Sequence, residues 1–390
     1  MPPSADVFWL ALRRVNGVGP RTCRLLIDKF ETPEKVFAAT AAELTHAGIS
    51  SRVAHAITDY RDFESLEREL CELPRLAARL VRWTDADYPP NLRQIADPPP
   101  YLFVRGDAPL ADPHCVAVVG ARAASEAGLR MAERLGFELA AKGFTVVSGL
   151  ARGIDGAAHQ GALGARGRTI AAMGCGIDIV YPPEHRQLAD SILAQGGALL
   201  TELPVGTQPL GENFPARNRI LSGLCLGVVI VEAAERSGSL ITARMALEQN
   251  RQVFAVPGSP LSGKARGSNR LLKEGALLVD CVEDVIEELA PQLQGQVSKP
   301  IGSARSSSTS GPTASKPLEA DLPRRMGDLG VDLLDNAKTV ITTLRDDQKL
   351  HVDAIIEASG LDAQTVLRLL LEMELRGIVA QHPGKLFSLA

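Results

Sequence analysis

The chain has 390 residues, enough for two or three domains and a sizeable core, and its 45% hydrophobic and 23% charged residues are typical of a soluble globular protein. With 46 acidic and 42 basic residues the formal net charge is −4, which excludes a uniformly basic surface of the histone type. Aromatic residues make up 4%, which disfavours an extended base-stacking platform. Any nucleic-acid site must therefore be a local cluster of arginines or lysines.

Targeting and redox features point to the cytoplasm. The N-terminus has no basic segment followed by an apolar run, and no apolar stretch approaches the ~20 residues of a spanning helix. The 6 cysteines are widely spaced and none forms a CxxC pair, so we expect free, mostly buried thiols. We therefore expect a cytoplasmic protein with no membrane association, no cofactor and no metal site.

Residues 1–82 follow a helical period, with Val7, Leu10 and Ala11 on one apolar face and little strand-like alternation. We expect a small all-helical domain of the sterile-alpha-motif or helix-hairpin-helix type. The segment Val15-Asn-Gly-Val-Gly-Pro-Arg21 resembles the hairpin of such modules, where glycine amides can contact DNA phosphates. Such bundles also serve as scaffolds, and both roles stay open.

Residues 83–290 alternate short apolar runs with amphipathic helices from about residue 114 onward. The runs expected to be strands are 116–119, 145–147, 169–173, 198–200, 228–231, 253–256 and 277–279. Apolar strands that alternate with helices indicate a parallel sheet covered on both faces. This pattern predicts an α/β fold, an extended Rossmann-like doubly wound sheet, in which ligands bind beyond the carboxyl ends of the strands.

Residues 291–334 are expected to be a flexible linker, because six serines, three prolines and two glycines fall within positions 300–317. Residues 335–390 then give helices near 338–345, 352–358 and 362–376, and a hairpin over 378–389 that turns at Pro383-Gly384. That order predicts a winged helix. Its eight acidic and six basic residues favour a protein-interaction or accessory role over primary DNA binding.

Five loops at the expected carboxyl edge of the sheet combine glycine or serine with arginine. The first, Val119-Gly120-Ala121-Arg122, lacks the G-x-G-x-x-G pattern of dinucleotide-binding folds. A tight glycine turn with exposed amides and an arginine at a helix N-terminus predicts a phosphate site instead. The candidate phosphate-binding residues are Gly120, Arg122, Ser148, Gly149, Arg152, Arg186, Arg217, Asn218, Arg219, Ser237, Gly238 and Ser239. Because residues 114–290 hold 17 basic and 18 acidic residues, charge must be segregated for these loops to bind an anion.

No catalytic residue is expected. Asp155 and His159, one helical turn apart, fit a capping carboxylate and a packing histidine better than an acid–base pair. Residues Gly258–Lys264 match the G-x4-G-K half of a P-loop, but Ala265 lacks the hydroxyl that would hold Mg²⁺.

Together the loops resemble the DNA processing protein A (DprA/Smf) family over roughly residues 88–280. The similar segments are Tyr88-Pro89, Asp97-Pro98-Pro99, 119–122, 148–155 with Ala158-His159, 176–178 with Tyr181-Pro182, 214–220, 237–243 and 256–258. The resemblance implies a non-enzymatic homodimer that binds and protects single-stranded DNA. It also implies loading of the RecA recombinase during natural transformation or recombination. By motif position, the family's phosphate-binding arginine falls on Arg122 and a second basic contact falls on Arg186.

Two other functions remain open from the residues alone. Rossmann-like nucleotide phosphoribohydrolases also hold a phosphate with glycine and arginine loops, and Glu232 at a strand end could supply their catalytic acid. Alternatively, the protein could be an adaptor that acts through its winged helix.

Overall fold

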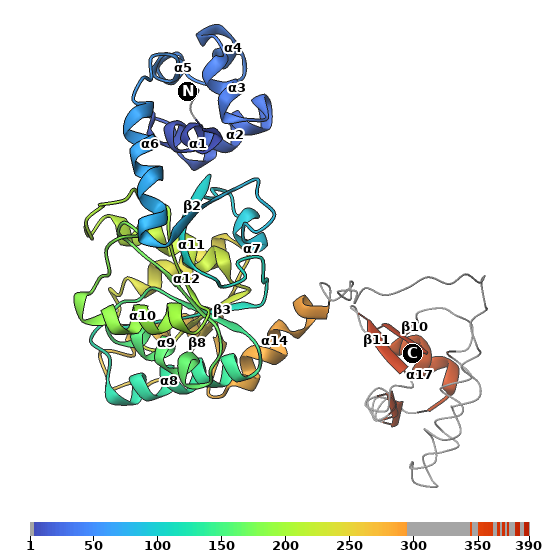
Figure 1. The fold of residues 1–390 in the computed structure, drawn as a ribbon. Coiled ribbons are helices and arrows are strands. Elements are labelled where there is room, and N and C mark those ends of the chain that lie inside the picture. The colour runs from blue at the N-terminus through green and yellow to red at the C-terminus, as the bar shows by residue number, and fades with distance from the viewer. Residues whose placement is uncertain are drawn as a thin grey trace, which may run out of the picture. The chain divides into compact units, whose positions relative to one another are not determined.

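The computed structural model describes residues 4–294, Leu344, residues 350–361 and separate positions from 365 to 389. The chain divides into two compact units, Met1–Pro300 and Ile301–Ala390, which are described separately (Figure 1). The first unit joins a helical domain to a mixed α/β sheet, as the sequence predicts.

The helical domain begins each helix at a residue suited to that position. Pro20 and Pro33 occupy first-turn positions where no amide donor is needed, and Thr40 forms a capping box with Glu43. Gly17, with φ +89°, makes the turn between the first two helices. The helices are α1 Ala5–Arg14, α2 Pro20–Phe30, α3 Pro33–Ala38, α4 Ala41–His46, α5 Ser51–Thr58, α6 Phe63–Glu72 and the 3₁₀ helix η1 Leu73–Leu76.

A nine-stranded sheet forms the centre of the first unit, in the order β1-β2-β6-β5-β4-β3-β7-β8-β9. Its strands are β1 Ala78–Arg82, β2 Tyr101–Gly106, β3 Cys115–Val119, β4 Thr145–Ser148, β5 Thr169–Ala172, β6 Ala198–Thr201, β7 Gly227–Ile230, β8 Gln252–Ala255 and β9 Leu277–Leu278. The strands from β3 to β9 run parallel to one another, which confirms all the predicted runs. Strands β1 and β2 extend the sheet antiparallel beyond β6.

The expectation that residues 1–82 contain no strand is wrong at Ala78–Arg82. Strand β1 is an edge strand that pairs only with β2 among the described strands, and only Val81 of its five residues is fully buried. The sheet therefore begins inside the range assigned to the helical domain.

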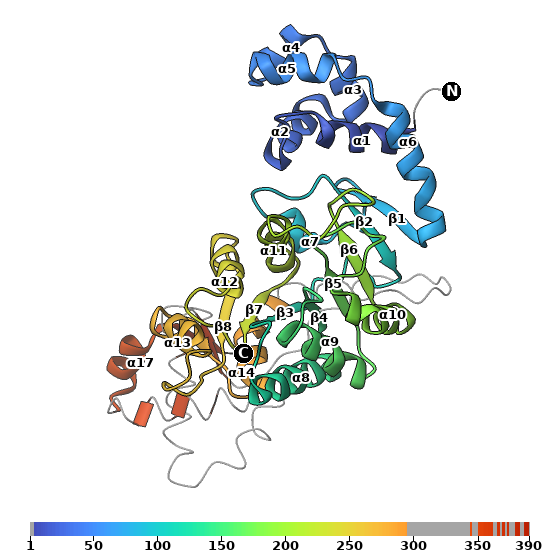
Figure 2. The ribbon, with the colours of Figure 1, turned by 90° about the vertical axis from the view of Figure 1, so that its left-hand side faces the viewer.

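Alternating side chains build a core on each face of the sheet. Val116 and Val118 of β3 pack under α8 and α9, whereas Ala117 and Val119 face α11 and α12. Figure 2 shows α8, α9 and α10 on one side of the strands and α7, α11 and α12 on the other. These helices are α7 Pro90–Arg93, α8 Glu126–Ala141, α9 Ile154–Gly164, η2 Pro183–His185, α10 Arg186–Ala194, α11 Asn213–Leu224, α12 Ser239–Glu248, α13 Arg266–Lys273 and α14 Val282–Gln294.

Helix α14 continues to Gln294, four residues into the segment expected as a linker, and the rest of that linker lies outside the described residues. Among the helices described in 4–294 and 350–389, none combines the length and apolar character needed to cross a membrane.

The second unit contains a three-stranded antiparallel sheet in the order β10-β12-β11, formed by β10 Leu350–His351, β11 Val379–His382 and β12 Leu386–Leu389. Helix α17 Val352–Ser359 matches the predicted second helix, and the predicted hairpin is present. Strand β10 was not predicted. The expected helix at 338–345, apart from Leu344, and the turn at Pro383-Gly384 lie outside the described residues.

Candidate nucleic-acid interface

A cavity of about 690 Å³ opens at the carboxyl end of the parallel strands. It is lined by the loop after β3, which contains Arg122, and by the loop after β7, which contains Ser237. Strands β3 and β7 are neighbours, and the chain continues from β3 to β4 on one side but from β7 to β8 on the other. The cavity therefore lies at the switch point of the doubly wound sheet, where such folds bind ligands.

Two arginines meet at one aromatic ring in this cavity. The guanidinium carbon of Arg122 lies 5.0 Å from the ring centroid of Phe214, and that of Arg217 lies 5.9 Å from it. Phe214 and Arg217 are three residues apart on α11 and so share a face of the helix, whereas Arg122 reaches the ring from the β3–α8 loop. Tyr181 packs against the same ring at 5.8 Å between centroids.

The charge of the cavity is positive. Its charged lining residues are three arginines, Arg122, Arg217 and Arg236, and one aspartate, Asp155. No carboxylate oxygen of the described residues comes within the 4.0 Å ion-pair limit of the guanidinium nitrogens of Arg122 or Arg217. The two arginines are thus close together and lack an anion at contact distance.

Arg217 is buried beneath the cavity. It donates to the carbonyl oxygen of Ala172, and its buried Nε has no hydrogen-bond partner. Burial lowers the pKa of the Arg217 guanidinium, the Asp155 carboxylate opposes that shift, and Arg122 adds to it. Burial likewise raises the pKa of Asp155, against the opposing effect of Arg217. An anion in the cavity would favour the charged form of Arg217.

Backbone amides and hydroxyls form another wall, at the start of α12. Ser237 and Ser239 share a hydrogen bond of 2.7 Å between their hydroxyl oxygens, and Gly238 precedes the first residue of the ten-residue helix. Gly238 has open space around its Cα, so the backbone here is accessible to a ligand. The amides of Ser239, Leu240 and Ile241 already donate within this turn, so this wall offers a phosphate the exposed backbone at Gly238 and the positive end of the α12 dipole, next to arginines.

Seven of the candidate site residues line this cavity: Gly120, Arg122, Arg217, Asn218, Ser237, Gly238 and Ser239. Ser148 and Gly149 lie beneath it. The buried Ser148 hydroxyl donates to the carbonyl of Val118, and the Gly149 amide donates to Asp155 Oδ2. A Cβ at Gly149 would come within 2.2 Å of the Arg217 guanidinium, so glycine is required for the close approach of these groups.

The remaining three candidates, Arg152, Arg186 and Arg219, do not line the cavity. The exposed Arg152 pairs with Glu184, and the exposed Arg186 is the first residue of α10. Arg219 is buried and contacts Glu202 at 2.6 Å and Asp97 at 3.5 Å. Two residues after Arg217, it extends from the opposite face of α11, since each helical residue turns the side chain by about 100°.

Sequence reasoning missed three cavity residues. Phe214 and Tyr181 were noted only as parts of motifs, and Arg236 was not considered. Two aromatic rings, those of Phe214 and Tyr181, therefore line the cavity beside the predicted arginines. The i, i+3 spacing of Phe214 and Arg217 is the signal that could have found the first of them.

Two residues considered for enzymatic chemistry, Glu232 and His159, make structural hydrogen bonds outside the cavity. Glu232 is buried, and its carboxylate accepts the amide of Ser125 at 2.7 Å at the start of α8. His159 is fully buried and its Nδ1 lies 2.7 Å from the Thr169 hydroxyl, which fits the packing role. Neither residue lines the cavity.

The near P-loop at 258–264 is a surface loop. Asn269 of α13 bonds to both the amide and the carbonyl of Gly258, and Leu261 is 96% exposed. The segment is therefore a surface loop held at Gly258.

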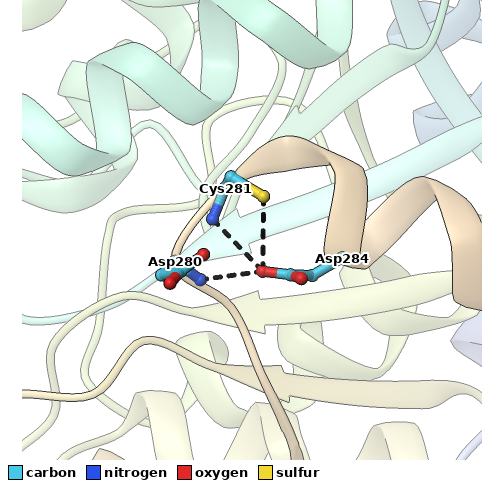
Figure 3. Close-up of side chains that lie close together, drawn as sticks. All are labelled: Asp280, Cys281 and Asp284. Carbon is cyan, nitrogen blue, oxygen red and sulfur yellow. Dashed lines mark hydrogen bonds between the residues drawn. The ribbon is translucent and has the colours of Figure 1, made fainter.

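A cluster of possible metal ligands outside the cavity is formed by Asp280, Cys281 and Asp284 (Figure 3). Asp284 Oδ2 accepts the amides of Asp280 at 3.0 Å and Cys281 at 3.2 Å. Because α14 begins at Val282, Asp284 is its third residue, and the carboxylate reaches back to cap the helix. The cluster is thus explained by capping. All the cysteines are free, and four of them are buried.

Comparison with known proteins covers each part of the chain. The family model of DNA recombination-mediator protein A matches residues 79–290, the DprA winged helix domain matches 331–385, and a SAM-like helix-hairpin-helix tandem matches 10–60. These matches confirm the predicted fold class, including the domains at both ends of the chain.

Relatives are found among bacterial proteins. The chain is 38% identical to protein Smf of Escherichia coli over 344 residues, which is 88% of this chain and 86% of the relative. It is 47% identical to DNA processing protein DprA of Streptococcus pneumoniae over 206 residues, covering 52% of this chain and 72% of the relative.

Two solved structures are similar to this one. The X-ray structure of DprA from Streptococcus pneumoniae matches with a TM-score of 0.62 and 35% identity, over 72% of this chain and 97% of that one. A structure of DprA from Helicobacter pylori, which concerns that protein's single-stranded DNA binding mode, matches with a TM-score of 0.50 and 29% identity, over 55% and 96% of the two chains. The resemblance inferred from the loop motifs is therefore confirmed, and the chain belongs to the DprA/Smf family of DNA recombination-mediator proteins.

Proposed function

We propose that this chain binds single-stranded DNA through the phosphates, in the cavity lined by Arg122, Phe214 and Arg217. The observation that carries the proposal is the convergence of two arginines on one ring with no carboxylate at contact distance among the described residues. Arg217 is buried with Asp155 as its nearby counter-charge, and Arg122 has no carboxylate at contact distance among the described residues, so a phosphate would add the negative charge that two arginines and one aspartate leave unbalanced. The Helicobacter pylori relative, whose structure concerns single-stranded DNA binding, supports the same ligand.

The lining residues suit an unpaired strand better than a duplex. A cavity of about 690 Å³ has the size of a small-molecule site and admits a nucleotide, not a double helix. The rings of Tyr181 and Phe214 offer a surface on which a base can stack, while Arg122 and the exposed backbone at Gly238 hold phosphates. Stacking tolerates any base, so we expect binding largely independent of sequence.

Arg152 and Arg186 remain proposed contacts for the strand outside the cavity, because both are exposed and follow loops at the same edge of the sheet. Arg219 is left out of the contact set, because its guanidinium is already paired with two carboxylates.

We further propose that the protein acts as a non-enzymatic homodimer, which protects incoming single strands and loads the RecA recombinase during natural transformation or recombination. Membership of a recombination-mediator family supports the recombination role. Two cavities joined in a dimer would raise avidity along one strand without any new kind of contact. The engagement of Glu232 in capping α8 favours this binding role over the phosphoribohydrolase alternative.

A salt titration of single-stranded DNA affinity tests the site. We expect Arg122→Ala to weaken binding about tenfold or more, because it removes a charge-assisted phosphate contact. The slope of log affinity against log salt should also become shallower by about 0.7. Arg130→Ala, which breaks an exposed ion pair with Glu126 on α8, is the matched control and should leave both values unchanged. An Arg122→Ala variant with wild-type affinity at two salt concentrations would falsify the site.

A further inference from the structure

The loop between β6 and α11, residues 202–212, forms one rim of the cavity. Its Pro209 and Gly211 line the cavity, and the helix that follows carries Phe214 and Arg217. The position of this loop therefore sets both the rim and the start of the helix that presents the aromatic ring.

The first half of the loop is held by the helical domain. In both views α6 runs from the other helices down to the sheet near β1 and β2 (Figures 1 and 2). From this helix, Glu69 Oε1 accepts the amide of Val205 at 2.9 Å. Its Oε2 accepts Nη2 of Arg14 at 2.7 Å, and the Glu69 side chain is only 12% exposed. A carboxylate oriented by an arginine and shielded from water makes a strong acceptor for a backbone amide.

The sheet domain holds the adjacent residues of the loop. Asp178 Oδ1 accepts the amide of Gly206 at 2.8 Å, and the amide of Gly176 donates to the carbonyl of Thr207 at 2.9 Å. Beyond Thr207, the hydrogen bonds described for residues 208–213 stay within the loop, such as that from the Asn213 side chain to the Gln208 carbonyl. The position of the cavity rim at Pro209 and Gly211 therefore depends on how residues 205–207 are held.

A crevice next to the loop makes the Glu69 contact important. The crevice, of about 560 Å³, is bordered by Arg14, Glu69, Pro204 and Val205, so on this side part of the loop faces open space. The hydrogen bond of Glu69 joins α6 to this loop at the edge of the crevice. Without it, the amide of Val205 would lose its acceptor next to a solvent-accessible space, and this part of the loop would rely on the packing of Val205 and on the bonds at Gly206 and Thr207.

We propose that Glu69 is a positioning residue for the DNA cavity: by fixing Val205, it holds the rim that the strand passes, without itself contacting DNA. The proposal rests on the proposed function, since it names what sets the geometry of that same cavity.

The direction in which DNA affinity changes when Glu69 is removed distinguishes a positioning role from a purely electrostatic one. Removing an acidic residue makes the protein less negative, and by long-range electrostatics alone it should strengthen DNA binding. Positioning predicts the opposite. We expect Glu69→Ala to weaken single-stranded DNA binding about threefold to tenfold, with an unchanged salt slope because no phosphate-contacting cation is lost.

Three further variants complete the experiment on the full-length chain. Glu69→Gln keeps an oxygen that can accept the Val205 amide and should recover most of the affinity. Glu72→Ala removes an exposed acid one turn further along the same helix and should leave binding unchanged or slightly stronger. Asp178→Ala releases Gly206 from the other side and should reproduce the effect of Glu69→Ala. It also tests the loop if Glu69→Ala fails to fold.

Hydrogen–deuterium exchange of residues 203–212 gives a readout that needs no DNA. Exchange there should be faster in Glu69→Ala and close to wild type in Glu69→Gln. Wild-type exchange and affinity in Glu69→Ala, or stronger binding equal to that of Glu72→Ala, would overturn the inference. If Arg122→Ala also binds like wild type, the proposed DNA site itself fails, whereas a weakened Arg122→Ala beside an unaffected Glu69→Ala rejects only the positioning role.

Discussion

Arg219 and Arg217 are two residues apart on α11 but have different roles: Arg217 lines the cavity, whereas Arg219 forms ion pairs away from it. The Arg219 side chain is 10% exposed and contacts Glu202 and Asp97, which come from β6's end and from the segment before β2. Removing Arg219 leaves the buried Glu202 carboxylate uncompensated, so we expect Arg219→Ala to lower the free energy of unfolding by about 3–5 kcal/mol, measured by urea denaturation. Arg134→Ala, which breaks an exposed pair with Glu138, should cost about 0.5 kcal/mol or less. A shallower salt slope of DNA binding with unchanged stability would instead make Arg219 a phosphate contact.

His159 should make folding stability depend on pH. Burial lowers its pKa to about 3 from an ordinary value of 6.5. Between these values the unfolded chain binds a proton that the folded chain does not, so stability decreases as the pH falls below about 6.5, by up to ~1.4 kcal/mol per pH unit. Urea unfolding at pH 7 and pH 5 measures this loss. In His159→Asn the loss over the same interval should be smaller, and an equal loss would exclude His159 as its source.

The individual site residues could be predicted only in part. The motif located Arg122, because a glycine turn after a strand places the next residues at the sheet edge whatever the rest of the fold. The ion-pair partners of the arginines could not be predicted from the sequence. Arg152 pairs with Glu184 and Arg219 pairs with Glu202, and each partner is far away along the chain. The helical period places Arg217 and Arg219 on different faces of α11, whereas the sequence motif grouped them because they are two residues apart.

Among the elements, α14 depends on the carboxylate that caps it. Asp284 accepts two backbone amides at the start of the helix, and Val282, Val285 and Leu289 pack into the core under α8. We expect Asp284→Ala to destabilise the protein by about 1 kcal/mol, as the loss of a helix cap does, in a thermal or urea titration. Addition of Zn²⁺ or Ca²⁺ to the wild type should leave the unfolding midpoint unchanged. A midpoint that rises with metal would show that the three side chains form a site and not only a cap.

The parallel strands were predictable because most of them, from β3 to β8, are short apolar runs buried on both faces, whereas β1 and β2 were not predicted. Strand β2 is buried from Tyr101 to Val104 but follows three prolines, so its sequence gives no separate signal of an antiparallel extension. Strand β1 is stabilised by its pairing with β2 and by packing of Ala78 and Leu80 on the helical core. Tertiary contacts of this kind leave no period in the local sequence.

At the scale of the whole molecule, the two compact units predict that the first one carries DNA binding. A chain truncated after Pro300 keeps the complete cavity and the Glu69 contact. We expect its single-stranded DNA affinity to stay within about fivefold of the full chain, about 1 kcal/mol, and its sedimentation at micromolar concentration to show a dimer. A strict monomer would place the dimer contact in the C-terminal unit, and a larger loss of affinity would give the winged helix a direct part in binding.

The fold of the winged helix could be predicted from the sequence, but which of its apolar residues lie on the surface could be predicted only in part. Its third helix carries more apolar residues than one face needs, and Val366, Leu369, Leu370 and Met373 are indeed buried in the core of the second unit. The other apolar positions of that helix, Leu367, Leu371 and Leu375, lie outside the described residues. A role in protein contact therefore stays a prediction.

The order of the strands has a consequence for synthesis on the ribosome. Strand β2 pairs with β6. Phe103 therefore cannot pair with Thr201 until that residue has been translated, about 100 residues later. At roughly 5–20 residues per second, this interval lasts about 5–20 s. During it, the helical domain and the β1–β2 pair have left the ribosome without the partner strand, and Tyr101 and Phe103 lack part of the core that finally buries them. The nascent chain therefore exposes an apolar strand edge that a chaperone could bind before the sheet is complete.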